Sequence, residues 1–183
     1  MANLFINACV REESRTLEIA KNIIKKMGIE VEEINLDKEK IKPLNSKRLI
    51  KREKLLNKNA LSNKMFDMAK QFADAETIII AAPYWDLSFP ALLKIYLENI
   101  SVLDITFSYK DDKPVGLCKA KKLIYVTTSG GEIFADFGYI YVKNLAGSLF
   151  GIKNTVCYRA ENLDIDNISK NEVLKKAKIV EIK

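Results

Sequence analysis

The chain has 183 residues, of which 48% are hydrophobic and 30% charged, and its formal net charge is +6. This balance is typical of a globular protein, so we expect one domain over residues 1–183 and exclude a disordered or membrane chain. No apolar run reaches the roughly 20 residues of a membrane-spanning helix, and the segment MANLFINACV lacks the features of a secretion signal. We therefore expect a cytoplasmic protein without a membrane partner.

Histidine is absent, and the three cysteines, Cys9, Cys118 and Cys157, form no CxxC pair. Neither a disulfide framework nor a metal site is predicted, and the commonest general base is missing. Any chemistry must come from carboxylates, hydroxyls, thiols or a bound cofactor. The excess lysines are scattered along helical stretches, which favours a solvated surface over a nucleic-acid interface; an anionic substrate is the alternative.

The first part of the chain alternates apolar strands with an amphipathic helix. The apolar run Asn3–Cys9 predicts a central parallel strand. A helix is predicted over Ser14–Met27, with Ser14 as its N-cap and Gly28 at its C-terminus. Apolar residues alternate with glutamates over Ile29–Ile34, and this pattern indicates a strand at an edge of the sheet.

The middle of the chain contains a long helical stretch and the most apolar strand. Helical spacing of apolar residues extends over Ser46–Ala75. The strand Thr77–Ala82 ends at Pro83. Pro90 then begins a helix that extends to about Ile100.

The next segment combines a charged turn with a fourth apolar strand. Aromatic and β-branched residues surround the turn in Ile105–Gly116, which predicts a hairpin or an excursion above the sheet. The fourth strand is Lys122–Thr128. Asp136 is a cap candidate for a helix that runs to about Phe150.

The chain closes with a fifth strand, Val156–Tyr158, and a helix over Ser169–Lys183. Strands and helices therefore alternate throughout. This alternation predicts a doubly wound parallel sheet with helices on both faces.

In such a sheet, ligands bind beyond the carboxyl ends of the strands. That rule selects three loops: Cys9–Thr16, Pro83–Phe89 and Thr128–Phe134. The first lacks the glycine patterns of dinucleotide-binding and P-loop proteins. It places Ser14, Arg15 and Thr16 at a helix N-terminus, where free amides favour a phosphate and Arg11 could add charge. Alternatively Ser14 only caps the helix, and Cys9 is a buried small residue.

The second and third loops have features suited to a flat ring. Tyr84 and Trp85 could form its wall, or they could cover the core or contact another subunit. Gly130 and Gly131 let a backbone approach a ring closely, or they form a tight turn.

Taken together, these segments resemble the FMN-dependent NAD(P)H quinone oxidoreductase and azoreductase family. The resemblance is carried by NACVREESRT (7–16), PYWDLSFP (83–90), LK (93–94), TFSY (106–109), TSGG (128–131) and LFGI (149–152). The first is similar to the family's phosphate loop. The second is similar to its loop against the flavin ring.

The resemblance implies a flavodoxin-like three-layer sandwich, with a five-stranded parallel sheet in the order 2-1-3-4-5 and helices on both faces. It implies a homodimer that binds FMN, takes a hydride from NADH or NADPH, and passes electrons to a quinone, azo or nitro compound in a ping-pong sequence. No arginine pattern selects NADH over NADPH. No side chain is assigned a catalytic role, because solvent can protonate the reduced acceptor.

The resemblance also implies the site residues. Those expected to bind the cofactor are Cys9, Arg11, Ser14, Arg15, Thr16, Pro83, Tyr84, Trp85, Asp86, Leu87, Thr128, Ser129, Gly130 and Gly131. Phe107 and Tyr109 are expected to line the substrate space.

Two residues depart from the family pattern. Cys9 stands where a serine is usual, and Asp86 stands where an asparagine is usual. The carboxylate of Asp86 either points away from the flavin or lowers its reduction potential. Two other functions stay open: a flavodoxin-type electron carrier, and a cofactor-free interaction protein on the same fold.

Overall fold

The computed structural model describes residues 2–180 and contains a six-stranded sheet in the order β2-β1-β3-β6-β7-β8. Its strands are β1 (Asn3–Asn7), β2 (Val31–Asn35), β3 (Thr77–Ala81), β6 (Lys122–Thr128), β7 (Thr155–Ala160) and β8 (Lys178–Val180). All neighbouring pairs are parallel except β7 and β8. The predicted five-stranded sheet is therefore wrong in its strand count, although the parallel strands have the predicted neighbours.

The sixth strand comes from the segment that was expected to form a closing helix over residues 169–183. The described part of that segment contains only the short 3-10 turn η3 (Val173–Lys175) before β8. The β-branched Ile179 and Val180 favour an extended backbone. Pairing with β7 also satisfies backbone groups that an edge strand would leave open. The last three predicted residues, 181–183, lie outside the described part.

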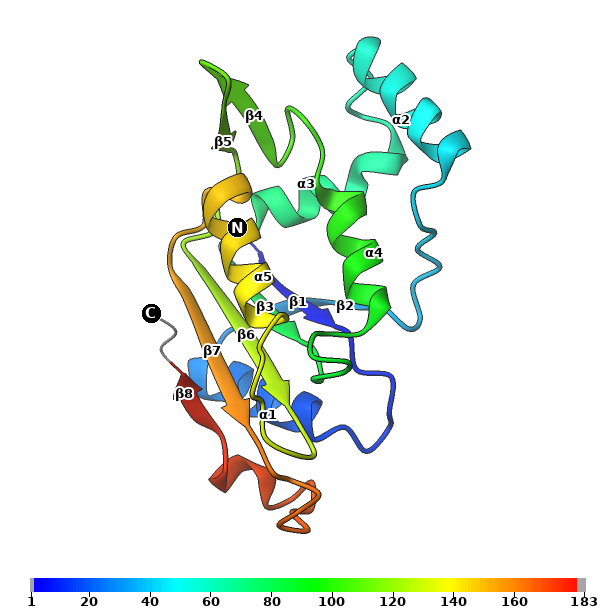
Figure 1. Ribbon diagram of the computed structural model, residues 1–183. Coiled ribbons are helices and arrows are strands. Elements are labelled where there is room, and N and C mark those ends of the chain that lie inside the picture. The colour runs from blue at the N-terminus through cyan, green and yellow to red at the C-terminus, as the bar shows by residue number, and fades with distance from the viewer. Residues whose placement is uncertain (1, 181–183) are drawn as a thin grey trace.

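Helices cover both faces of the sheet, which confirms the three-layer prediction (Figure 1). Side chains of the central strands alternate between the faces: Phe5, Ile79 and Ile124 pack toward α1 (Arg15–Met27). The residues next to them along each strand pack against the layer on the opposite face. That layer contains α3 (Asp67–Asp74), α4 (Ala91–Ile100), α5 (Tyr139–Leu145) and the π-helix η2 (Ala146–Phe150). Across residues 2–180, no helix combines the length and apolar character needed to cross a bilayer.

The single long helix predicted over Ser46–Ala75 is instead broken in two. α2 (Ser46–Asn57) is followed by a turn, by the 3-10 helix η1 (Lys64–Phe66), and then by α3. Asparagines cause the break because their side chains bond nearby backbone groups: Asn59 has a φ of 51°, and Asn63 accepts from the amide of Met65. α2 buries none of its residues and stands at the periphery of the molecule (Figure 1).

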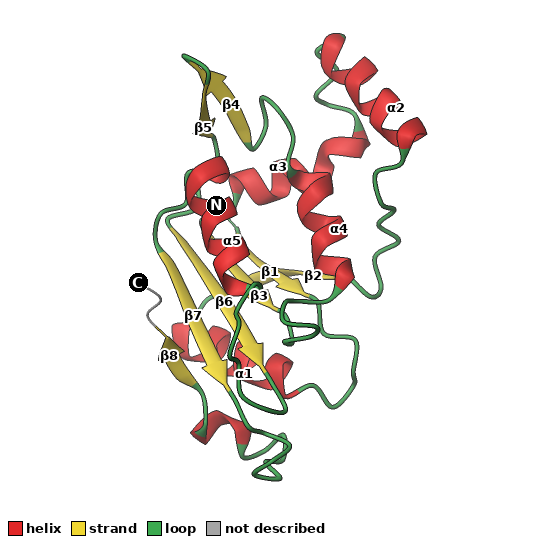
Figure 2. Ribbon diagram, viewed as in Figure 1, coloured by secondary structure: helices red, strands yellow, loops and turns green. Residues whose placement is uncertain are grey.

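The predicted hairpin is confirmed as β4 (Phe107–Lys110) and β5 (Lys113–Gly116), an antiparallel pair. Its base packs closely against η2, where a Cβ on Gly116 would collide with the backbone of Phe150 and Gly151. The chain leaves this base to enter β6, so the hairpin projects from the amino ends of the parallel strands (Figure 2). This position is opposite to the edge where a ligand is expected.

Candidate functional site

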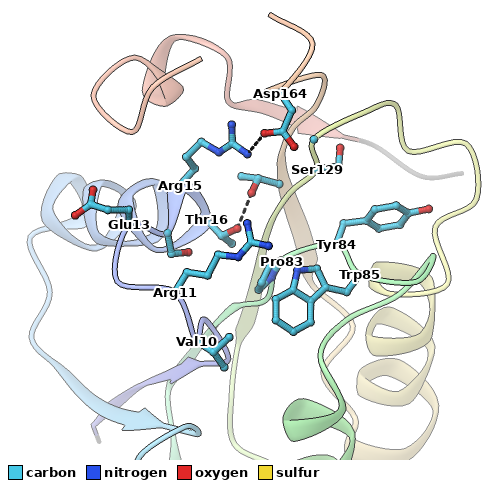
Figure 3. A pocket seen from close by; sticks show the side chains of 13 residues that line it. Val10, Arg11, Glu13, Arg15, Thr16, Pro83, Tyr84, Trp85, Ser129 and Asp164 are labelled. Atoms are coloured by element: carbon cyan, nitrogen blue, oxygen red, sulfur yellow. Dashed lines mark hydrogen bonds and ion pairs between the residues drawn. The ribbon is translucent and has the colours of Figure 1, made fainter. Parts of the chain in front are cut away.

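A cavity of about 200 Å³ opens at the carboxyl ends of β1, β3 and β6 (Figure 3). All three predicted loops contribute to it. The predicted residues that line it are Arg11, Ser14, Arg15, Thr16, Pro83, Tyr84, Trp85, Thr128, Ser129 and Gly130. The topology therefore brings together segments that are more than a hundred residues apart in the chain.

The N-terminus of α1 forms one wall of the cavity. Ser14 is its N-cap, as predicted: the Ser14 Oγ accepts a hydrogen bond from the amide of Leu17 at 3.2 Å. The same side chain also lies within hydrogen-bonding reach of the Cys9 thiol. The hydroxyls of Thr16 and Thr128 hydrogen-bond at 2.6 Å, and both side chains are buried. Buried hydroxyls and a positive helix end together suit an anionic group.

The two arginines near this wall differ in their partners. Arg15 forms an ion pair with Asp164 at 2.5 Å and donates to the carbonyl of Ile168 at 3.2 Å. Arg11 extends into the cavity from the loop before α1 (Figure 3). It forms no ion pair with a carboxylate among residues 2–180. Arg11 is therefore the better placed of the two to meet an anion, and Arg15 mainly ties α1 to the loop after β7.

Tyr84 and Trp85 line the cavity, and a strained turn follows them. Trp85 and Ser88 exchange two backbone hydrogen bonds, at 3.1 and 2.7 Å, which close a two-residue turn. Asp86 and Leu87 in this turn have φ values of 49° and 64°. This is the type I′ geometry, which favours Asn-Gly, and a left-handed leucine costs about 1–2 kcal/mol.

Ion pairs and hydrogen bonds hold the third loop in place. Arg159 lies 3.5 Å from Asp136 and 3.4 Å from Glu161. Asp136 accepts from the amide of Tyr139, the first residue of α5, although the N-cap is Gly138 and not the predicted Asp136. Glu161 accepts from the amide of Ile133. The hydroxyl of Tyr84 donates to the carbonyl of Ala135 at 2.8 Å, so the second and third loops are joined directly.

Several predicted residues lie outside the cavity lining. Asp86 is exposed, and neither Leu87 nor Gly131 lines the cavity. Cys9 is buried beneath it, with its Sγ 3.7 Å from the carbonyl of Ala81, and burial raises the pKa of this thiol to about 11. Cys9 is thus a packed neutral thiol, as the alternative interpretation had it.

The two predicted substrate residues are also remote. Phe107 and Tyr109 lie in the hairpin at the opposite end of the sheet, so they do not face the cavity of their own chain. Their rings pack edge to face with centroids 5.8 Å apart, and Tyr109 is 61% exposed.

Sequence reasoning missed three residues that line the cavity: Val10, Glu13 and Asp164. Val10 and Glu13 lie inside a predicted loop and could have been included for that reason. Asp164 lies 149 residues from its partner Arg15. No local pattern marks it.

Comparisons with known proteins agree with this geometry. A family model described as a flavodoxin-like fold matches residues 1–180. An FMN-dependent NADH:quinone oxidoreductase of Clostridium perfringens is 37% identical over 179 residues, covering 92% of this chain and 90% of the relative. An enzyme of the same name from Clostridium beijerinckii is 37% identical, covering 95% and 92%.

A solved structure extends the agreement to the fold. An FMN-dependent NADH-azoreductase from Bacillus anthracis, in complex with FMN, superposes with a TM-score of 0.79. It is 25% identical, and the match covers 96% of this chain and 93% of that one.

Proposed function

The chain belongs to the flavodoxin-like family of FMN-dependent NADH:quinone oxidoreductases, and from this premise we propose that it reduces quinones, azo or nitro compounds with NADH or NADPH. The observation that carries the proposal is the cavity at the carboxyl edge of the sheet. It combines a helix N-terminus, buried hydroxyls and two aromatic side chains. Phosphate and a flat ring are the two parts of FMN that this combination suits.

The residues present fit the phosphate end of FMN. We propose that Ser14 and Thr16, with the first amides of α1, bind the phosphate, and that Arg11 adds a charge-assisted bond. The ion pair between Arg15 and Asp164 holds α1 in position for this. A volume of about 200 Å³ is enough for a phosphate and part of a ribityl chain, and the ring would lie toward the open side.

The aromatic loop and the third loop fit the ring. We propose that Tyr84 and Trp85 contact it on one side, and that the backbone amide of Gly130 donates to its polar edge, since the amide of Ser129 already donates to the carbonyl of Ala160. The bound FMN would supply the redox chemistry, which is to accept a hydride from the nicotinamide and to pass the electrons to the acceptor. The exposed position of Asp86 supports the interpretation that its carboxylate points away from the ring.

An anaerobic titration tests the proposal. The purified protein, reconstituted with FMN, should be yellow and should bleach with NADH or NADPH and regain colour with a quinone. Initial rates at several acceptor concentrations should give parallel double-reciprocal lines, because in a ping-pong order the oxidised nicotinamide leaves first. If FMN binds but does not bleach with either nicotinamide, the result favours the flavodoxin-type electron carrier. If FMN does not bind, it favours the cofactor-free interaction protein.

We also propose that the active form is a homodimer in the cytoplasm, the compartment in which NADH is regenerated. The position of the hairpin supports the dimer: Phe107 and Tyr109 can line a substrate space only if it belongs to a second subunit. Light scattering should give a mass near twice the 20.8 kDa of one chain.

Replacing Tyr109 with alanine tests this arrangement. We expect the KM for the quinone to rise about tenfold, since the proposed aromatic contact with the substrate, worth about 1–2 kcal/mol, is lost, while FMN stays bound. Tyr109→Phe keeps the ring and serves as the matched control. An unchanged KM in a variant that is still dimeric would contradict a role for the hairpin in substrate binding.

A further inference from the structure

A second cavity lies far from the flavin site, beside the peripheral helix α2. It has a volume of about 780 Å³ and is formed by the segment before α2, by α2 itself, by η1 and by α4. It shares no lining residue with the cavity at the carboxyl edge. We call it the α2 groove. In Figure 1, α2 stands well away from α1, whose N-terminus forms the flavin site.

The α2 groove carries a strong excess of positive charge. Five cations line it, against one carboxylate, that of Glu39. The cations are Lys40, Lys42, Arg48, Lys51 and Lys64. None of the five forms an ion pair with a carboxylate within residues 2–180. By contrast, Lys94 and Lys119 elsewhere on the surface are paired. The groove is therefore a region of unbalanced positive potential.

Arg48 is held in a defined orientation in this groove. Its Nη2 donates to the Oδ1 of Asn99 at 2.9 Å. The Nδ2 of Asn99 in turn donates to the carbonyls of Ile95 at 2.8 Å and Lys42 at 3.1 Å, which fixes the direction of the amide. The Nε of Arg48 is buried within the protein, so a ligand in the groove would meet the Nη donors of the guanidinium. A positioned guanidinium with unused donors is the arrangement that binds an oxyanion.

The rest of the lining is apolar and adaptable. Ile41 and Met68 pack partly against the core, and Met65 lies beside them in the groove. Methionine side chains are flexible and polarisable, so they accept apolar bodies of different shapes. A groove with cations above an apolar floor therefore favours an organic anion over an inorganic one.

From these features we propose that the α2 groove binds small aromatic or acyl compounds that carry a carboxylate, sulfonate or phosphate group. The anionic group bonds Arg48 and Lys51, and the apolar body packs on Met65 and Met68. This inference goes beyond the proposed oxidoreductase activity and does not depend on it, because the two cavities have no residue in common.

Calorimetric titration of the FMN-loaded protein with naphthalene-1-sulfonate tests the proposal. We expect saturable binding, and we expect Arg48→Met to weaken it by about 10- to 100-fold, the effect of losing a charged hydrogen-bonding partner. Lys51→Met should weaken it by a smaller factor of about 2 to 5. The matched control is Lys54→Met, on the same helix but outside the groove lining, which should leave binding unchanged.

Three results would overturn the assignment. They are no binding of the sulfonate, equal binding of the uncharged 1-naphthalenemethanol, and equal weakening by Lys54→Met and Lys51→Met. Titration of Ser14→Ala/Thr16→Val, a variant directed at the flavin site, separates the two sites: sulfonate binding should persist there. If the unmutated protein binds the sulfonate but its flavin is not reduced by NADH or NADPH, the proposed function is contradicted and the α2 groove assignment is not.

Discussion

Replacing Ser14 with alanine and Thr16 with valine should weaken FMN binding by about 100-fold or more. Each hydroxyl is proposed to bond a charged phosphate, and each such bond contributes about 1.5–3 kcal/mol. Both side chains are buried at the N-terminus of α1 and line the cavity. Fluorescence quenching of FMN during titration with the apoprotein measures the change.

A second helix cap provides the control for this variant. Ser14→Ala also removes the bond to the Leu17 amide, which should lower the free energy of unfolding by about 1 kcal/mol. Asn45 caps α2 in the same way, through the amide of Arg48, and lies outside the flavin cavity. Asn45→Ala should therefore cost a similar stability but leave FMN affinity unchanged. Equal flavin affinity in the double variant and in Asn45→Ala would contradict the proposal that the phosphate binds at the N-terminus of α1.

Replacing Phe72 with alanine should lower the free energy of unfolding by about 3–5 kcal/mol. Phe72 is fully buried between two aromatic neighbours, with ring centroids 5.0 Å from Phe150 and 6.4 Å from Tyr96. The change leaves a cavity where α3, α4 and η2 meet, and these rigid elements cannot close it. Urea denaturation followed by circular dichroism measures the loss.

An exposed phenylalanine is the matched control for Phe72. Phe134 is 78% exposed, so Phe134→Ala should change the free energy of unfolding by no more than about 0.5 kcal/mol. Comparable losses in the two variants would show that the aromatic cluster does not stabilise the fold as described. The FMN affinity of folded Phe72→Ala should stay near its original value, because the cluster lies away from the cavity lining.

The parallel part of the fold is predictable because its apolar runs are compatible with only one kind of element. Runs such as Thr77–Ala81 are buried on both faces, and only a central strand requires that. The C-terminal segment is different, since its lysines suit a solvated helix as well as an edge strand. Ile179 is 60% exposed even in β8, so burial does not distinguish the two there. The pairing with β7 decides the outcome, and pairing partners are not visible in a local pattern.

The site shows the same division between local and distant information. Ser14 and Thr16 could be predicted because adjacent residues of the sequence indicate where the helix begins and which residue caps it. Asp164 and Arg159 could not, since their roles depend on contacts with Arg15 and Asp136 across the folded chain. The hairpin was predicted correctly as an element, but its distance from the cavity follows only from the three-dimensional arrangement.

The turn at Asp86 and Leu87 has a consequence for anyone who redesigns this protein. Asparagine followed by glycine would suit its backbone better, so a stability-guided procedure would select this turn for replacement. Yet the turn begins at Trp85, a wall of the cavity. A thermostable version obtained in this way would carry its altered residues directly beside the proposed flavin, and its gain in melting temperature would say nothing about retained activity.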